Sequence, residues 1–416
     1  MENNAVAIRL WDKVLGYLSW DEQKHCSFFV FDEGFLATPW DVAPLGWSIH
    51  SSSALVPRYG NTEKPYAGLP PFVADSLPDH WGNRVFEAWA KRNGIASSKL
   101  TALDRLSFIG KRGMGALEFE PAQLLTGEDM PIPVAELYHL AIAIQEERQD
   151  AWIKGRGNVL LEDLYRVGNS VGGKRAKAVI AINKEGIIRS GQAELTPDYT
   201  HYILKFNDDR VFPFSEVEFA YYKMAIAAGI DMMHSILMTI EGKRHFLTER
   251  FDRHKNEKIH VLTLAAMDPD ANSYEDLFSV GRRLRLPDAQ QKEMFRRLVF
   301  NVMGCNVDDH SKNFSFIMDK QGKWSLAPAY DILFTVDLDG PRYVNRHSIS
   351  VGIKTDGITV DDLRVFASEN DIGQADVIIN EVMTALQAWT TFASEAGVPE
   401  RWIERIAVNL QEQWRG

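Results

Sequence analysis

The residues best suited to chemistry lie in the polar segment NVDDHSKN (306–313) and at Asp331. Asp308 and Asn313 are spaced as D-x-x-x-x-N, and Asp331 follows further along the chain. Phosphoryl transfer uses an Asp that accepts the proton of the attacking hydroxyl, and an Asn and a second Asp that hold Mg²⁺ on nucleotide phosphates. The types and order of these residues therefore indicate phosphoryl transfer. Asp and Asn also form turns and helix caps, so a structural role for an isolated match stays open.

The elements expected around these residues would bring them together. Apolar side chains at i, i+3, i+4 and i+7 over 295–302 predict a helix that leads into the polar segment. The runs FSFI (314–317) and WSLAPAY (324–330) are typical of strands. If these two strands pair as a hairpin, Asn313 and Asp331 lie side by side.

A lysine in an apolar strand provides the next candidate. Lys205 lies in HYILKF, where an ammonium group facing the core is costly unless it meets an anion, and a phosphate is a suitable anion. Protein kinases pair such a lysine with a helical glutamate, and Glu218, on a helix expected over 216–228, is the candidate. Two alternatives stay open: Lys205 could extend to solvent at a sheet edge, and Glu218 could serve a capping box over 215–218.

A basic, glycine-containing loop, SVGGKRAK (170–177), precedes the strand-like run AKAVIAIN (176–183). Glycines let backbone N–H groups approach a phosphate, and nearby cations favour that anion. The loop does not match G-x-x-x-x-G-K-[ST], which excludes a Walker loop, and a solvated basic turn is the alternative. The candidate phosphate-binding residues are Gly172, Gly173, Lys174, Arg175, Ala176 and Lys177.

Three further groups of residues lie next to these motifs in the sequence. Glu249 and Phe251 end a strand, where backbone groups could bond an adenine edge while the ring packs nearby; a purely structural role is the alternative. Asp252 and Arg253 are expected to form a structural ion pair. His310 is expected to donate to a phosphate, because the sequence has neither paired cysteines nor a His-Glu-x-x-His pattern that would indicate zinc.

Composition limits the function classes. The 416 residues carry 46 Lys plus Arg against 57 Asp plus Glu, and the net charge of -11 disfavours unaided binding to nucleic acid. Any role on DNA is therefore expected to be indirect, through a basic partner. The chain has two cysteines, no recognisable signal peptide and no apolar run of membrane-spanning length, so we expect a cytoplasmic protein that does not enter a membrane.

The chain divides into three zones. Residues 1–126 open with strand-like runs at 6–11, 14–20 and 25–31 and are expected to form a β-rich module that also contains helices. Residues 127–260 form a connector, with a helix expected over 134–149, and then a strand-dominated lobe. Residues 261–416 are mainly helical. The expected fold class is α+β: a two-lobed protein-kinase-like fold with an N-terminal β-rich module and a mainly helical C-terminal lobe.

Taken together, these segments resemble the HipA family, bacterial serine/threonine kinases that serve as toxins of toxin–antitoxin pairs. The resemblance covers nearly the whole chain. It is carried by SVGGKRAKA as phosphate-binding loop, HYILKF as lysine strand, LTERFDR as hinge, NVDDHSKNFSF with LAPAYD as catalytic loop and metal site, and by LPPFVADSLPDHWGNRV and LDRLSFIGKRGMGALEFEP in the N-terminal module.

The resemblance implies a role for each matching position. Asp308 would be the catalytic base, and Asn313 and Asp331 would bind Mg²⁺. Lys205, His310 and the backbone of 172–177 would contact the phosphates of ATP, and Glu249 and Phe251 would hold adenine. Ser170 matches a serine that the family autophosphorylates to silence itself. Asp309 stands where the founding member has glycine, which leaves the loop shape and an additional metal contact open.

The function that follows is an ATP- and Mg²⁺-dependent serine/threonine protein kinase. By resemblance, its substrate would be a translation-related protein such as an aminoacyl-tRNA synthetase, and the outcome would be growth arrest. A helix-turn-helix antitoxin (HipB-like) would bind this acidic chain and bring it to operator DNA. Two alternatives remain: a small-molecule phosphotransferase with the same catalytic residues, and a catalytically silent co-repressor or binding module.

Overall fold

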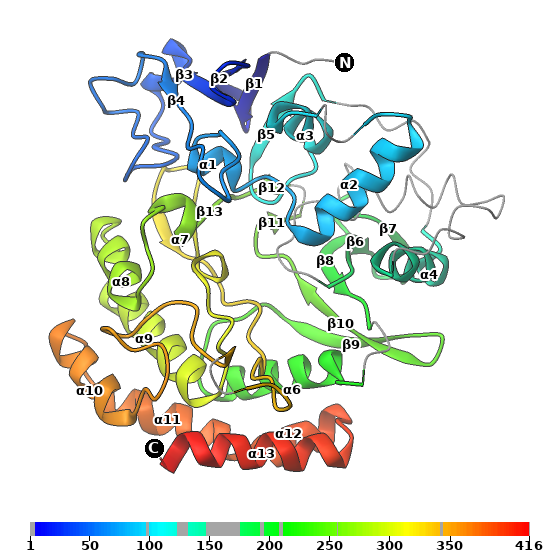
Figure 1. The fold of residues 1–416 in the computed structure, drawn as a ribbon, viewed down its shortest axis with the longest axis vertical. Helices are drawn as coiled ribbons and strands as arrows, with labels where there is room; N and C mark the ends of the chain where they lie inside the picture. The colour runs from blue at the N-terminus through cyan, green and yellow to red at the C-terminus, as the bar shows by residue number, and fades with distance from the viewer. Residues whose placement is uncertain are drawn as a thin grey trace.

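The computed structural model describes residues 5–96, 100–122, 132–146, 175–191, 195–207, 211–255, 257–341 and 344–415. An N-terminal sheet lies at one end of the molecule and the C-terminal helices lie at the other (Figure 1). A second sheet lies between these ends, on the right in this view. Both helices and sheets contribute, so the α+β class expected from the sequence is confirmed.

The N-terminal module is built on a five-stranded antiparallel sheet, ordered β4-β3-β2-β1-β5. In β1, Val6, Ile8 and Leu10 are buried and alternate with more exposed residues, as in a sheet with one face on the core. The strands predicted at 6–11, 14–20 and 25–31 are confirmed. The elements are β1 (Ala5–Leu10), β2 (Lys13–Asp21), β3 (Cys26–Phe31), η1 (Glu33–Ala37), β4 (Arg58–Tyr59), α1 (Pro71–Ala74), α2 (His80–Arg92), α3 (Ala102–Ile109) and β5 (Leu117–Glu120).

A second five-stranded antiparallel sheet, ordered β7-β6-β8-β10-β9, forms the N-lobe. The short β7 lies within a segment for which the sequence predicted only a loop. Helix α6 packs against β9 and β10, and α4 contacts α2 of the N-terminal module. The elements are α4 (Val134–Gln145), β6 (Lys177–Ile182), β7 (Ile188–Ser190), β8 (Thr200–Lys205), α6 (Phe214–Ala227), β9 (Ser235–Ile240) and β10 (Lys243–Glu249).

The start of α6 differs from the prediction. The helix begins at Phe214, and the capping residue is Pro213, which makes no side-chain hydrogen bond. Ser215 lies inside the first turn, and its buried Oγ has no hydrogen-bond partner among the described residues. The capping box predicted over 215–218 is therefore wrong. Proline, with its fixed φ and no N–H, suits the entrance of a helix, so the capping serine is not needed. Glu218 is consequently free of a capping role.

The rest of the chain forms a C-lobe of helices around a small antiparallel sheet, ordered β13-β14-β15. Pairing of β14 with β15 confirms the predicted hairpin, and α9 confirms the helix predicted over 295–302. The strands are β11 (Arg253–His254), β12 (Glu257–Lys258), β13 (His260–Thr263), β14 (Ser315–Met318) and β15 (Trp324–Leu326). The helices are α7 (Leu264–Met267), α8 (Tyr274–Arg283), α9 (Asp288–Met303), η4 (Ser311–Asn313), α10 (Val360–Glu369), α11 (Ala375–Gln387), α12 (Trp389–Ala396) and α13 (Glu400–Arg415).

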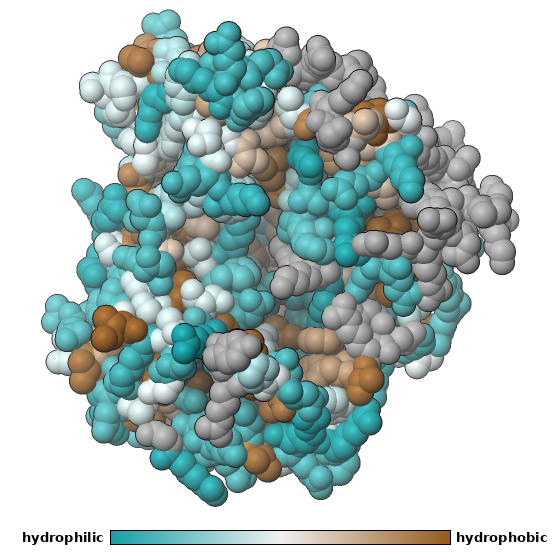
Figure 2. All heavy atoms as spheres, viewed as in Figure 1, coloured by the Kyte–Doolittle hydropathy of each residue, from teal (hydrophilic) through white to brown (hydrophobic). Residues whose placement is uncertain are grey.

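The face drawn in Figure 2 is mostly polar. Hydrophilic residues predominate on this face, and the hydrophobic residues lie scattered among them. Scattered apolar residues are normal on a folded protein and do not by themselves mark a binding site. In the part of the chain that the structure describes, no helix combines the length and the apolar composition that crossing a bilayer requires.

Candidate active site

A cleft of about 210 Å³ lies where the N-terminal module, the N-lobe sheet and the C-lobe meet. The module contributes Asp75 and Asp79 to its walls. Six of the residues proposed from the sequence for nucleotide binding line the same cleft: Lys205, Glu249, Phe251, His310, Asn313 and Asp331. Residues far apart in the sequence are therefore gathered at one concave site.

Lys205 lies at the centre of the charged groups. It ends β8, its side chain is buried, and its Nζ forms ion pairs with Glu218 Oε1 and with Asp331 Oδ1. Burial acts to lower the pKa of this ammonium group, but the carboxylates of Asp331 and Glu218 outweigh burial and raise it. Lys205 is thus a buried cation, and the alternative in which it extends to solvent at a sheet edge is excluded.

Glu218 holds two cations. It projects from the second turn of α6 with its side chain almost fully buried. Its Oε1 faces Lys205, and its Oε2 accepts a hydrogen bond from Arg175 Nη1 at 3.1 Å. A carboxylate without such partners would be costly to bury, and these contacts compensate for that cost. The pairing of Glu218 with Lys205 therefore follows from the packing of α6 against the sheet that contains β8.

Asp331 follows β15 in an unusual backbone conformation. Its φ of 52° lies in the left-handed region, which Asp tolerates better than most non-glycine residues. Burial acts to raise the pKa of Asp331, but the charges of Lys205 and Lys177 lower it by more than burial raises it. The net shift of this pKa is therefore downward. A non-glycine residue held in this region at a cleft is a common feature of functional sites.

The segment 306–313 places Asn313 and Asp308 next to each other. Asn313 ends η4, and its Nδ2 donates a hydrogen bond to the backbone carbonyl of Asp308 at 2.7 Å. The backbone N–H of Asp308 donates to Thr335 Oγ1 at 3.1 Å. Asp308 is exposed and is not among the residues that line the cleft. The structure therefore places Asp308 beside the cleft, where it can reach a molecule that approaches from solvent.

The donor atoms at this site suit a magnesium ion. Asn313 turns its amide nitrogen to Asp308, which leaves its amide oxygen for a cation, and Asp331 supplies a carboxylate in the same cleft. Within the described ranges, no three His, Cys, Asp or Glu side chains are grouped as a metal site. Mg²⁺ typically takes one or two protein oxygens together with substrate phosphates and water. Asn313 and Asp331 fit that pattern.

His310 and the hinge complete the cleft. His310 lies at the start of η4, and its buried Nδ1 has no hydrogen-bond partner among the described residues. Glu249 ends β10, and its backbone N–H is already bonded to the His234 carbonyl. The ring of Phe251 stacks on Tyr330, with centroids 5.7 Å apart. These contacts fix the wall where adenine is expected.

Only residues 175–177 of the predicted phosphate-binding loop lie within the described ranges. Ser170, Gly172, Gly173 and Lys174 lie outside the described residues. Arg175 turns its guanidinium to Glu218, and the Ala176 N–H donates to Gln145 Oε1 at 3.1 Å. The expectation that backbone amides up to residue 177 cradle phosphate therefore does not fit Ala176, because α4 already occupies that amide.

Asp309 is a functional candidate of a different kind. Its side chain is fully buried, where Oδ2 accepts from the Tyr274 hydroxyl at 2.7 Å and lies 2.8 Å from His347 Nδ1. Its Oδ1 accepts from the Ser348 backbone N–H at 2.8 Å. Asp309 thus faces the interior of the C-lobe, and the additional metal contact left open by the sequence is not formed. These contacts tie the segment 306–313 to the interior of the C-lobe.

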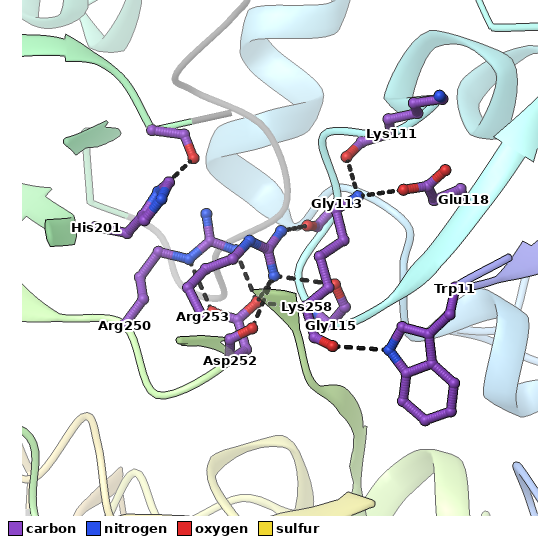
Figure 3. A network of polar contacts seen from close by, with 11 residues as sticks. Trp11, Lys111, Gly113, Gly115, Glu118, His201, Arg250, Asp252, Arg253 and Lys258 are labelled. Atoms are coloured by element: carbon purple, nitrogen blue, oxygen red, sulfur yellow. Dashed lines mark hydrogen bonds and ion pairs between the residues drawn. The ribbon is translucent and has the colours of Figure 1, made fainter. Parts of the chain in front are cut away.

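A buried ionic network links the hinge to the N-terminal module (Figure 3). Asp252 accepts from Arg250 Nε and Nη2 at 2.8 and 2.7 Å and from Arg253 Nη1 at 2.7 Å. The module contributes Gly115, whose N–H donates to Asp252 and whose carbonyl accepts from Arg253, and Gly113, whose carbonyl also accepts from Arg253. The predicted pair of Asp252 and Arg253 is confirmed. Its extension to Arg250 and to the module could not be read from the sequence.

The comparisons with known proteins agree with this architecture. Residues 6–120 match the HipA N-terminal domain, and residues 169–414 match the HipA-like C-terminal domain. Over 98% of this chain, the fold is similar to 95% of a chain from the structure "Shewanella oneidensis MR-1 Toxin Antitoxin System HipA, HipB and its operator DNA complex", with a TM-score of 0.67 and 16% sequence identity. The kinase-like two-lobed fold is thereby confirmed.

Two relatives share sequence with parts of the chain. "Putative kinase Y4mE" of Sinorhizobium fredii is 28% identical over 237 residues, which cover 53% of this chain and 49% of that protein. The chain thus spans about half the length of this relative. "Serine/threonine-protein kinase toxin HipA" of Shewanella oneidensis is 36% identical over 66 residues, 16% of this chain and 15% of that protein. Because the two family domains match residues 6–120 and 169–414, the chain belongs to the HipA family.

Proposed function

We propose that this protein is an ATP- and Mg²⁺-dependent serine/threonine protein kinase that acts as the toxin of a toxin–antitoxin pair. The observation that carries the proposal is the contact of Lys205 with both Glu218 and Asp331 in a cleft that Asn313 and His310 also line. This set of residues supplies what phosphoryl transfer requires, because that reaction depends on positioning and on charge stabilisation.

In this proposal the cleft binds the nucleotide. Lys205 and His310 face its phosphates, and the chain around Glu249 and Phe251 holds adenine against the hinge. Asn313 and Asp331 are the residues that would hold Mg²⁺. When bound, that ion offsets the negative charge of the phosphate oxygens.

Asp308 then acts on the acceptor. Its carboxylate takes the proton of the acceptor hydroxyl, and the hydroxyl oxygen forms a bond to the γ-phosphorus. The bond from that phosphorus to the bridging oxygen breaks, and ADP leaves with the electron pair. The exposed position of Asp308, beside the cleft and tied to Asn313, supports this role because the acceptor must arrive from solvent.

The acceptor is inferred from the resemblance to the HipA family, and the partner is supported by a similar solved structure. We propose that the acceptor is a Ser or Thr of a translation-related protein, possible examples being the aminoacyl-tRNA synthetases, and that the reaction takes place in the cytoplasm. A helix-turn-helix antitoxin would bind the acidic chain and carry it to DNA. The similar fold of a chain from a complex that includes HipB and operator DNA supports this partner class.

Two finer points belong to the same proposal. We propose Ser170 as the site of autophosphorylation, because its position matches the serine that the family modifies. A phosphate dianion there would inhibit the kinase by competing with ATP. We also divide the chain into a module over 1–126, an N-lobe over 127–260 and a C-lobe over 261–416. The first boundary follows β5. The second lies at the start of β13, so that β11 and β12 count with the N-lobe in this division.

The proposal is tested by incubating the purified protein with γ-labelled ATP, Mg²⁺ and a bacterial lysate, alongside the Asp308→Ala variant. Label on a discrete protein, and phosphate on Ser170 by peptide mass spectrometry, are expected for the wild type and not for the variant. Label confined to small molecules would instead indicate a small-molecule phosphotransferase. Failure of the wild type to bind Mg²⁺ and ATP would indicate a binding module without catalysis.

A further inference from the structure

Two lysines oppose each other where β6 meets β8. Lys177 and Lys205 are cross-strand partners in this antiparallel pair, and both side chains are buried. Directly opposed residues project from the same face of a sheet, and like charges in that arrangement repel. The two ammonium groups can stay side by side only if separate anions hold them. Lys205 has Glu218 and Asp331 for this purpose.

The anion for Lys177 comes from the N-terminal module. Asp79 Oδ2 lies 3.5 Å from Lys177 Nζ, and Asp79 also lines the cleft. Its other oxygen, Oδ1, caps α2 by accepting from the Gly82 N–H at 2.8 Å. Two residues further on, Trp81 Nε1 donates to the backbone carbonyl of Lys177 at 2.8 Å. The first turn of α2 therefore holds both the side chain and the backbone of this lysine.

Each buried cation around β6 and β8 has a carboxylate partner in this arrangement. Three cations, Arg175, Lys177 and Lys205, face three carboxylates, Glu218, Asp331 and Asp79. Burial lowers the pKa of Lys177, and the nearby charge of Asp79 acts in the opposite direction. Asp331 and Lys205 are the groups that a metal-bound triphosphate would engage, whereas Asp79 has no other cation within ion-pair distance among the described residues.

We propose that Asp79 is a positioning residue of the nucleotide site: it holds the Lys177 ammonium group beside Lys205, where both face the triphosphate. This inference rests on the proposed function. Its consequence is that the N-terminal module forms part of the nucleotide site and does not serve only as a surface for other proteins. The carboxylate of Asp79 acts through Lys177, so its removal should change nucleotide affinity more than the rate of transfer.

The test uses the full chain and three variants: Asp79→Asn, Lys177→Met and the double variant. Asn retains an oxygen for the cap of α2 and removes the charge. We expect Asp79→Asn to raise the Kd and the KM for Mg²⁺·ATP about tenfold while kcat changes less than about threefold. In the Lys177→Met background, the same substitution should have no further effect on affinity. Asp79→Glu should restore part of the lost affinity.

Asp362→Asn is the matched control. Like Asp79→Asn, it replaces a carboxylate at the N-terminal end of a helix, here α10. Asp362 lies outside the cleft, so ATP affinity should stay at the wild-type value. Wild-type affinity in Asp79→Asn, or an equal loss with and without Lys177, would overturn the inference and leave the proposed function standing. A wild-type protein that binds no Mg²⁺·ATP would overturn both. Thermal unfolding of each variant separates loss of binding from loss of fold.

Discussion

Lys205 of β8 forms an ion pair with Asp331, which lies 126 residues further along the chain. The pair joins the N-lobe sheet to the loop after β15, so the two lobes meet through opposite charges inside the cleft. Because Lys205 is buried and Asp331 is only partly exposed, solvent screens their contact less than it would screen a surface pair. The same pair brings the predicted phosphate ligand and the predicted metal ligand into one site.

Replacing Asp331 by Asn should abolish phosphoryl transfer and leave the fold intact. The amide has nearly the same shape but lacks the charge that would hold Mg²⁺, so we expect the rate to fall about 100-fold or more. Titration of ATP with and without Mg²⁺ should show that the metal no longer improves affinity. Asp361→Asn, on the exposed face of α10, serves as the control. An unchanged Mg²⁺ dependence in Asp331→Asn would remove Asp331 from the metal site.

Substitution of Asp309 should lower the stability of the protein, whereas substitution of its neighbour Asp308 should remove its activity. Asp309→Ala leaves the Tyr274 hydroxyl and the Ser348 N–H without their buried acceptor, so the free energy of unfolding should fall by about 3 kcal/mol. Asp308→Ala, at an exposed position, should change it by less than about 0.5 kcal/mol while removing transfer activity. Urea unfolding monitored by circular dichroism measures both. Equal stability of the two variants would contradict the anchoring role of Asp309.

The hinge network predicts a large stability effect at Asp252. Its side chain is fully buried between two arginines, so Asp252→Asn would leave uncompensated guanidinium charge and lower the free energy of unfolding by about 3 to 5 kcal/mol. Asp361→Asn disrupts an exposed pair with Arg364, which solvent screens, so its effect on the free energy of unfolding should be much smaller. A small effect at Asp252 in chemical unfolding would show that the network does not stabilise the junction with the module.

Two buried histidines predict a loss of stability in mild acid. Burial lowers the pKa of His260 to about 4, and burial together with the charge of Arg250 does the same for His201. Between about pH 6.5 and 4 the unfolded chain binds these protons and the folded chain does not, so the free energy of unfolding falls as the pH falls. Unfolding curves at about pH 7 and about pH 5 measure this dependence.

A His260→Gln variant provides the comparison for that dependence. Gln removes one titrating group and keeps a donor for the Val42 carbonyl, which lies 3.1 Å from His260 Nε2. The variant should lose less stability than the wild type between the two pH values, whatever its stability at neutral pH. An identical pH dependence in the two proteins would show that His260 does not contribute to it.

The sequence predicted the elements better than their ends and contacts. Alternating or periodic apolar residues specified β1 to β3, β8, β14 and α9, because burial of one face leaves a direct trace in residue order. The first turn of α6 was predicted wrongly, since Ser215 and Glu218 match a capping box by type and spacing alone. Whether a carboxylate caps its own helix or meets a lysine from another strand depends on packing.

The sequence by itself determined the residue types for the chemistry and their order along the chain: Lys205, Asp308, Asn313 and Asp331. Only the tertiary structure decided which residues meet across the cleft, that Asp309 turns inward, and that Asp79 of the module faces Lys177. Local patterns encode strands and helices because those depend on neighbouring residues. Contacts between distant segments depend on how the whole chain packs, and no short motif records that arrangement.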